Sequence, residues 1–347
     1  MVFLTVARDD ENRRLDRVLR KAFPRVPPGA LAGAVRRGAV RVNGRRCRNE
    51  TRVHEGDILK VPAWETPEEE PTRSVRYRDR CIQAGSWRIP VIDRSTNWLV
   101  LNKPAGLAVH GAESLDLIVR SVARDEGWWS ESLSFRPGPV HRLDRNTSGV
   151  QLFALSTEGA RALSEQLSRR EVFKLYLAVV QGILEEERET SLPLRYDNRR
   201  RRTETADVGA PDSPPPSFSA ARTAIIPLAH SLRDRFTLVA AIPYTGRTHQ
   251  IRGHCAAIGH PLAGDRKYGA APAAGAGAGG TTYLLHSLLM MVTTTGTFWN
   301  APLPGEARIH LERQFPALPA LPALARRIRE VVQATCTVTG VNGTIEL

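Results

Sequence analysis

The decisive stretch of the chain is Pro-Val-His-Arg-Leu-Asp-Arg-Asn-Thr-Ser-Gly-Val, residues 139–150, a polar loop that runs directly into an apolar strand expected over residues 150–155. Asp144 lies between Arg142 and Arg145, and nearby positive charge favours the ionised carboxylate. A charged carboxylate at the start of a strand has the rigid support that a nucleophile or a general base needs. On these residues alone, a structural ion pair at Asp144 followed by a simple turn explains the pattern at least as well.

Four further stretches accompany this loop, and they read LNKPAGLAVH (residues 101–110), KLYLA (174–178), GRTHQIR (246–252) and GHPLAGDRKYG (259–269). Together with the loop, in this order, they closely resemble the motifs of the pseudouridine synthases of the RluA family, which modify large-subunit rRNA and tRNA. The resemblance covers residues 91 to about 304. A protein-kinase catalytic loop also contains His-Arg-Asp, but here Leu143 intervenes and no kinase asparagine follows at the required spacing.

The resemblance implies an α+β fold, in which the catalytic domain is built on a bent, mainly antiparallel sheet that the active-site cleft crosses. It also implies that Asp144 is the catalytic nucleophile and that Arg252 holds this carboxylate ionised and oriented in a water-poor pocket. Tyr176 matches the tyrosine that stacks on the target base near the proton lost from C5. The strand expected over residues 172–180 agrees, because alternation puts Tyr176 on the face opposite its most apolar neighbours.

Contacts with RNA near the reaction centre are implied in the same way. The uridine must leave its stack to reach Asp144, which costs roughly a few kcal/mol. Arg142 is placed to brace the vacated space with its planar guanidinium. Lys103 and His141 are also expected to contact RNA. The remaining matches to family positions are assigned to pocket structure or RNA contact, and they are His110, Asp265 and Tyr268.

The charge of the chain points to a polyanionic partner. Its 347 residues carry a formal net charge of +13, and residues 1–62 hold 15 Lys and Arg against 7 Asp and Glu. Basic patches are the electrostatic signature of nucleic-acid binding. The order Arg-Leu-Asp, helix, Gly-x-Val-x-Val-Asn-Gly hairpin and Gly-Asp resembles the small RNA-binding module named after ribosomal protein S-four. The RNA face of this module would consist of Arg36, Arg37, Arg41, Arg45, Arg46 and Arg48.

Composition and motifs divide the chain into four segments. We expect an S-four-like domain over residues 1–63, a linker over 64–90, a catalytic domain over 91–318, and a C-terminal helix and tail over 319–347. The linker is inferred from the acidic, proline-bearing residues 65–71. Residues 195–220 look like an excursion, whose consecutive arginines 199–202 either reach phosphates or form a solvated charge run. A helix is expected over residues 248–258, with Thr248 as its cap.

Neither a metal nor a cofactor is expected. Isomerisation of uridine involves no redox change and no energy input. The four cysteines lie far apart without a Cys-x-x-Cys pair, which fits a reducing cytoplasm. Four histidines of the C-terminal half lack the i, i+4 pairing or the nearby carboxylate of a zinc helix, and they are His249, His254, His260 and His286.

We expect a soluble, cytoplasmic monomer that binds RNA and does not associate with membranes. The most apolar stretch, near residues 283–292, is too short to span a bilayer. Charged residues at positions 8–10 come before the apolar core of a signal peptide can form.

Several alternatives stay open at this point. The substrate is expected to be one or a few uridines of large-subunit rRNA, but the motifs do not exclude tRNA. A non-catalytic RNA-binding or ribosome-assembly protein would use Asp144 structurally. A sugar-directed hydrolase would need a second carboxylate near Asp144, and none lies nearby in sequence. Attack at C1′, loss of the 2′ proton and addition at C6 are equally compatible with one aspartate.

Overall fold

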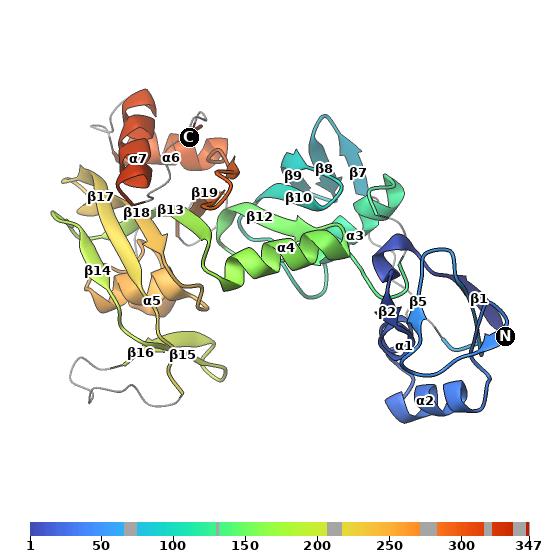
Figure 1. The fold of residues 1–347 in the computed structure, drawn as a ribbon. Coiled ribbons are helices and arrows are strands. Elements are labelled where there is room, and N and C mark those ends of the chain that lie inside the picture. Colours follow the sequence, from blue (N-terminus) through green and yellow to red (C-terminus); the bar gives the residue numbers. More distant parts are fainter. Residues whose placement is uncertain are drawn as a thin grey trace.

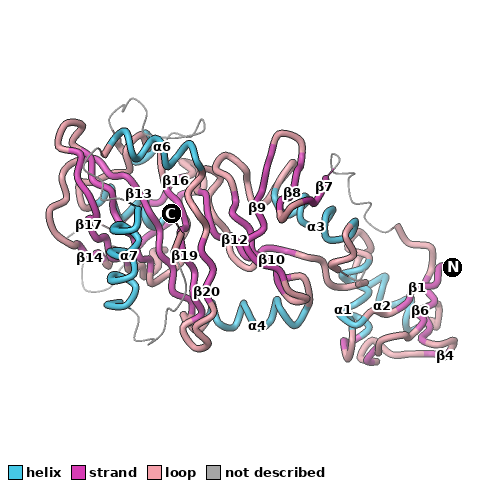
Figure 2. The backbone as a smooth tube through the Cα atoms, turned by 90° about the horizontal axis from the view of Figure 1, so that it is seen from above, coloured by secondary structure: helices cyan, strands magenta, loops and turns pink. Residues whose placement is uncertain are grey.

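The computed structural model describes residues 1–65, 75–129, 132–206, 217–270, 283–315, 321–335 and 345–346. A small N-terminal unit lies at one end of the molecule, beside a larger unit built around one long sheet (Figure 1). The view from above keeps this order, with α6 and α7 at the end away from the N-terminal unit (Figure 2). Within the described ranges, no helix is both long and apolar enough to cross a membrane.

The N-terminal unit combines two helices with a four-stranded sheet in the order β1-β6-β3-β4. Leu15, Val18 and Leu19 recur at helical spacing and are buried in its core. Asn43 and Gly44 both have positive φ and make the β3–β4 turn that the Asn-Gly pair predicts. The elements are β1 (Val2–Thr5), a 3-10 turn (Arg8–Asp10), β2 (Arg13–Arg14), α1 (Leu15–Ala22), α2 (Pro28–Arg36), β3 (Arg41–Val42), β4 (Arg45–Arg46), β5 (Arg52–Val53) and β6 (Ile58–Val61).

A sheet of 12 strands organises the larger unit, and its main path runs β14-β17-β18-β13-β19-β12-β10-β9-β8-β7. Within the described part of the chain, its strand pairings are antiparallel except that of β12 with β19, so the predicted α+β class with a mainly antiparallel sheet is confirmed. The strands are β7 (Val75–Arg78), β8 (Cys81–Ala84), β9 (Trp87–Arg94), β10 (Trp98–Lys103), β11 (Gly138–Pro139), β12 (Ser148–Ala154), β13 (Val172–Gln181), β14 (Arg188–Thr190), β17 (Thr223–Ser231), β18 (Phe236–Pro243), β19 (Leu285–Val292) and β20 (Phe298–Asn300). A separate hairpin consists of β15 (Leu194–Asp197) and β16 (Arg202–Thr205).

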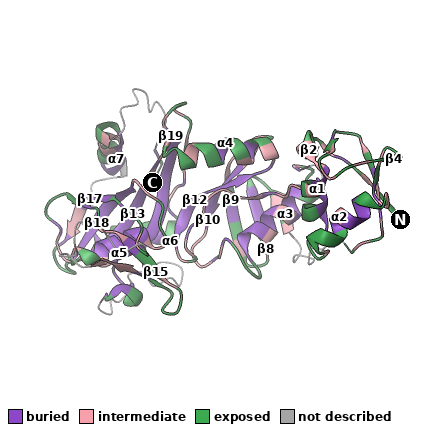
Figure 3. Cartoon of the chain, turned by 60° about the horizontal axis from the view of Figure 1, so that its bottom comes forward, coloured by how far each residue is buried: buried purple, intermediate pink, exposed green. Residues whose placement is uncertain are grey.

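Helices pack against both faces of this sheet, and buried strands lie between them (Figure 3). They are α3 (Leu115–Asp125), α4 (Thr157–Ser168), α5 (Gln250–Ala257), the 3-10 turn Arg266–Tyr268, α6 (Gly305–Gln314) and α7 (Leu321–Thr335). α6 and α7 share a core with Leu175 and Leu177 of β13. Tyr176 and Ala178 lie in a different core together with α5. The alternation expected for residues 172–180 is therefore confirmed, and Tyr176 is on the α5 face.

Two of the expected segments, the linker and the C-terminal tail, differ from the structure. Residues 75–90 of the expected linker form β7, β8 and the start of β9, because their alternating apolar side chains pack under α3. The acidic composition that suggested a linker belongs mainly to residues 66–74, which lie outside the described part of the chain. The expected C-terminal helix is α7, but it packs with Ile345 into the core of the sheet rather than forming a separate tail.

Gly149 allows the parallel contact of the sheet, where β12 meets β19. Its φ is +109°, a backbone conformation that side chains other than glycine rarely adopt. A Cβ atom at this position would lie 2.2 Å from the carbonyl oxygen of Ser287. The close approach of the two strands therefore requires glycine directly after the loop that carries Asp144.

Asp9 and Asp10 join the N-terminal unit to the larger one. The carboxylate of Asp10 is completely buried and accepts hydrogen bonds from Ser132 Oγ, the Leu133 N–H and both donors of Ser134. Asp9 accepts a 2.7 Å bond from the N–H of Thr157, the first residue of α4, where backbone N–H groups lack helical partners. The two units are therefore docked through specific bonds as well as connected by the chain.

We predict that Asp10→Asn uncouples the two units. The amide cannot accept all the bonds that the carboxylate accepts, and each buried donor left unpaired costs about 1–3 kcal/mol. Calorimetry should then show two unfolding transitions where the wild-type protein shows one. Asp79→Asn is the matched control, because Asp79 is an exposed aspartate whose left-handed backbone suits asparagine. Identical unfolding of the two variants would contradict the proposed docking.

Candidate active site

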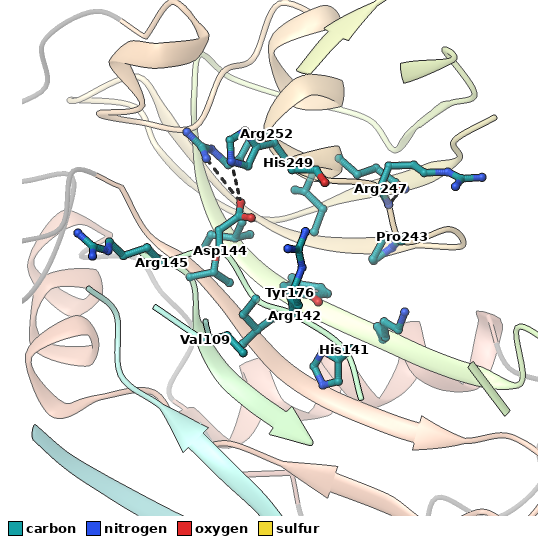
Figure 4. A pocket seen from close by; sticks show the side chains of 18 of the residues that line it. Val109, His141, Arg142, Asp144, Arg145, Tyr176, Pro243, Arg247, His249 and Arg252 are labelled. Carbon is teal, nitrogen blue, oxygen red and sulfur yellow. Dashed lines mark hydrogen bonds and ion pairs between the residues drawn. The ribbon is translucent and has the colours of Figure 1, made fainter. Parts of the chain in front are cut away.

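A cavity of about 640 Å³ opens between the loop before β12, the strand β13 and the start of α5. The loop contributes Asp144 to the lining, β13 contributes Tyr176, and the start of α5 contributes Arg252. These three residues, far apart in sequence, are therefore brought to one cavity. Figure 4 shows the Asp144 carboxylate directed at Arg252, and it labels Arg142 and Tyr176 in the lining of the same cavity. A second cavity of about 390 Å³ shares Asp144, Arg145, His249 and Arg252 with the first, and its lining adds the basic residues Arg266 and Lys267.

Arg252 connects two carboxylates. Its Nη1 lies 3.5 Å from Oδ2 of Asp144. Its Nε and Nη2 donate bonds of 2.6 and 3.0 Å to the two carboxylate oxygens of Asp265. Arg252 and Asp265 are 5% and 1% exposed, and bidentate pairing of this kind fixes a guanidinium plane. Asp265, assigned from the sequence to pocket structure or RNA contact, is thus a buried support of Arg252.

Two tyrosine rings enclose the guanidinium of Arg252. Its central carbon lies 4.8 Å from the ring centroid of Tyr268 and 4.7 Å from that of Tyr283, distances typical of cation–π contacts. Burial alone would lower the pKa of Arg252, but the bonds to Asp265 and the neighbouring negative charges raise it overall. Arg252 is therefore a fixed positive charge beside Asp144.

Tyr176 lies on β13 at the wall of the cavity and is 9% exposed. Burial is the main cause that raises its pKa to about 12, and the charge of Asp144 adds to the shift. The phenol is therefore neutral at pH 7. It combines an aromatic face with a hydroxyl group inside the same cavity as Asp144.

The expectation that Lys103 binds RNA is wrong. Its side chain is completely buried, and its ammonium donates to the carbonyl oxygens of Pro104, Leu107 and Arg145 at 2.8–3.0 Å. Burial lowers the pKa of Lys103 to about 7. Since Arg145 directly follows Asp144, the role of Lys103 in the structure is to hold the loop that carries the carboxylate.

His141 and Arg142 both line the cavity, but with different chemistry. Burial, followed by the charge of Lys174, lowers the pKa of His141 to about 3, and its Nε2 accepts the N–H of Leu152. His141 is therefore neutral, so it cannot bind RNA as a cation. Arg142 is exposed at the cavity, as a residue that contacts RNA must be.

His249 is the residue near Asp144 that the sequence pattern did not single out for catalysis. The expected cap Thr248 is not the N-cap of α5, because that position belongs to His249, whose φ is 53°. This left-handed backbone turns the ring toward the cavity, with Nε2 3.8 Å from Oδ2 of Asp144. The signal for it in the sequence was its place in the motif GRTHQIR, three residues before Arg252.

The expected excursion over residues 195–220 contains the β15–β16 hairpin, which packs beside α5. Two of its arginines are paired within the hairpin, since Arg195 contacts Glu204, and Arg200 contacts both Asp197 and Glu204. Residues 207–216 of the excursion lie outside the described residues. The hairpin therefore acts in the structure as a wall beside the site.

The expected RNA face of the N-terminal unit is exposed. Its arginines come from the end of α2 and from the β3–β4 hairpin, and the guanidinium of Arg46 packs over Gly38 at the end of α2. Among the described residues, no carboxylate pairs with any of these arginines, which are Arg36, Arg37, Arg41, Arg45, Arg46 and, just after the hairpin, Arg48. Across all the residues that the structure describes, no group of three His, Cys, Asp or Glu side chains is placed to hold a metal ion.

Comparison with known proteins identifies the class. The family model described as RNA pseudouridylate synthase matches residues 97–257, and the model of the S4 domain matches residues 13–59. The human protein RNA Pseudouridylate Synthase Domain Containing 4 has a similar fold, with a TM-score of 0.53 and 22% identity over 65% of this chain and 92% of that one.

Curated relatives identify the family within this class. The ribosomal large subunit pseudouridine synthase C of Haemophilus influenzae is 32% identical over 278 residues, which cover 77% of this chain and 78% of the relative. The protein of the same name from Yersinia pestis is 33% identical over 270 residues, covering 77% and 79%. This chain therefore belongs to the pseudouridine synthases, in the RluA family, and it is an isomerase that acts on RNA.

Proposed function

We propose that this protein converts one or a few uridines of large-subunit ribosomal RNA to pseudouridine, with Asp144 as the nucleophile. The observation that carries the proposal is the pairing of Asp144 with buried Arg252 in a cavity that also contains Tyr176. The substrate class is supported by relatives named for the large ribosomal subunit, which match over most of their length. The exposed arginines of the S4 domain supply a second surface for RNA.

In the proposed reaction the N1–C1′ bond of uridine breaks, the base turns over, and C5 bonds to C1′. The C5 proton is lost, N1 gains a proton, and no electrons are exchanged with another molecule. The ionised Asp144 forms a transient bond to the substrate, at C1′ of the ribose or at C6 of the base. Arg252 keeps the carboxylate charged and oriented, and its own support by Asp265 makes this arrangement rigid before substrate binds.

Tyr176 and Arg142 receive the flipped nucleotide. The neutral phenol of Tyr176 offers its ring to the uracil and its hydroxyl to the polar edge near C5. Arg142, at the open side of the cavity, stacks in the space that the uridine leaves in the RNA. One chain supplies all these groups, so we propose that a monomer is active. The free cysteines and a ribosomal substrate fit the cytoplasm.

The test is to map pseudouridine across total RNA from cells with and without this protein, using carbodiimide adducts that stop reverse transcription. We expect one or a few large-subunit rRNA sites to disappear and to return with the wild-type gene, but not with Asp144→Asn. The basic S4 face should matter most on such a large folded RNA, where it finds its own docking surface. Loss of a site only in tRNA, with every rRNA site retained, would refute the substrate and leave the chemistry standing.

A further inference from the structure

His249 faces the same oxygen of Asp144 as Arg252 does. The shortest approach of the imidazole is from Nε2 to Oδ2, at 3.8 Å, and the shortest approach of the guanidinium is from Nη1 to Oδ2, at 3.5 Å. Two donors that converge on one carboxylate oxygen distinguish it from the other. Oδ1 is thereby left as the oxygen with fewer constraints at the cavity.

A hydrogen-bonded chain starting from the hairpin fixes the imidazole. The N–H of Thr203 on β16 donates a 2.7 Å bond to the hydroxyl oxygen of Tyr268. That oxygen lies 2.8 Å from Nδ1 of His249. The Thr203 N–H occupies one acceptor position of this oxygen, and the hydroxyl proton is free to be donated to Nδ1. With that proton on Nδ1, the proton of the neutral ring is on Nε2.

The hairpin holds the same segment at two more points. The hydroxyl of Thr203 donates a 2.6 Å bond to the carbonyl oxygen of Thr248. The ring of Tyr196 on β15 meets the imidazole edge-on, with centroids 5.7 Å apart. These contacts secure the left-handed backbone of His249, which costs free energy in a residue other than glycine.

The ionisation of His249 agrees with this tautomer. The groups that face it are the charges of Asp144, Arg252, Lys267 and Asp265 and the rings of Tyr196 and Tyr268. Burial is the largest influence and lowers the pKa of the ring, against the raising effect of Asp144. The imidazole is therefore neutral at pH 7 and has one ring proton to direct.

We propose that His249 is a positioning residue of the isomerisation: it directs its Nε2–H at Oδ2 of Asp144, so that Oδ1 is the oxygen that meets the substrate. The contact shortens to a hydrogen bond when the nucleotide is bound, as catalytic contacts commonly do. The β15–β16 hairpin, through Thr203 and Tyr268, sets the direction of this proton. The inference rests on the proposed role of Asp144 in the same cavity.

Three variants separate the parts of this arrangement in the full-length protein. His249→Asn keeps an amide near the Nδ1 position, suits a left-handed backbone, and cannot reach Asp144. His249→Gln places an amide N–H near the Nε2 position. Tyr268→Phe removes only the hydroxyl and keeps the ring beside Arg252. Tyr77→Phe is the control, since it makes the same chemical change in the core under α3, away from the cavity.

The kinetic measurement is kcat and KM on a large-subunit rRNA fragment that contains the mapped uridine. We expect His249→Asn to lower kcat about 100-fold, which is the rate loss that follows when a reacting group is misplaced. KM should change less than about threefold. His249→Gln should recover most of this loss, and Tyr268→Phe should lose about tenfold. Tyr77→Phe should match the wild type. A kcat within about twofold of wild type in His249→Asn would overturn the proposal.

The second measurement reads the tautomer and needs no activity. In wild-type protein labelled with ¹⁵N-histidine, the signal of His249 is the one that His249→Asn removes. This signal should have the chemical shifts of the Nε2–H tautomer. In Tyr268→Phe it should shift toward a mixture of the Nε2–H and Nδ1–H tautomers. A wild-type Nδ1–H tautomer would overturn the inference. An inactive wild-type protein would instead refute the proposed function, and the NMR result would still decide the geometry.

Discussion

Asp144→Asn should abolish pseudouridine formation while the protein stays folded and binds RNA. The amide has nearly the same shape as the carboxylate, but it is neither charged nor a nucleophile. The loss should be about 10⁴-fold or more, equivalent to about 5 kcal/mol in the activation barrier. The fold should survive because Arg252 keeps its bidentate bonds to Asp265, so that its buried charge does not lose every partner.

Tritium released from RNA labelled at C5 of uridine measures this loss directly. The control is Asp125→Asn, which makes the same change at an exposed aspartate at the end of α3. Filter binding of the same RNA tests whether affinity is retained. Activity of Asp144→Asn within tenfold of the wild type would remove Asp144 from the mechanism, whatever the behaviour of the other residues in the cavity.

Arg252→Met should reduce stability as well as activity. Removing the guanidinium leaves the carboxylate of Asp265, which is 1% exposed, without its partner, and breaking a buried pair on one side costs about 3–5 kcal/mol. Asp144 loses its nearest cation at the same time. We expect the denaturant midpoint to fall, and activity to be lost even at a temperature where the variant is folded.

A second variant separates the two effects of Arg252. Arg252→Met combined with Asp265→Asn removes both charges of the bidentate pair, so most of the lost stability should return while activity stays absent. Arg252→Lys keeps a charge but cannot bond both oxygens of Asp265 and also approach Asp144. An unchanged unfolding midpoint in Arg252→Met, or recovered activity in the double variant, would contradict this assignment.

Local patterns in the sequence predicted those parts of the site that depend on one element. Alternation along β13 placed Tyr176 on the face opposite Leu175 and Leu177, which in the structure is the face that packs against α5. The Asn-Gly pair placed the β3–β4 turn. The meeting of Asp144 with Arg252, 108 positions later in the chain, came from the resemblance of motifs. Nothing local to either residue predicts that distance.

The wrong predictions and the overlooked residue also have physical reasons. Lys103 was assigned to RNA contact from the resemblance of motifs, and a lysine is almost never completely buried. In the structure, three carbonyl oxygens from two loops compensate its burial. The acidic residues before β7 dominated the composition of that segment and hid the alternation of the strands that follow. His249 escaped notice because its direction depends on a left-handed backbone and on a hairpin that starts 55 positions earlier.

The bonds to the buried carboxylate of Asp10 fix the distance between the S4 domain and the cavity. An RNA-binding unit on a flexible linker could bind an RNA at many distances from the catalytic cavity. Each binding event would then cost conformational entropy of the linker. With Asp9 and Asp10 bonded to the larger unit, the S4 arginines and the cavity keep one span. An RNA then fits only if its fold presents the docking surface and the uridine at that span. Lengthening the stem between them by a few base pairs should remove modification, although every individual contact remains possible.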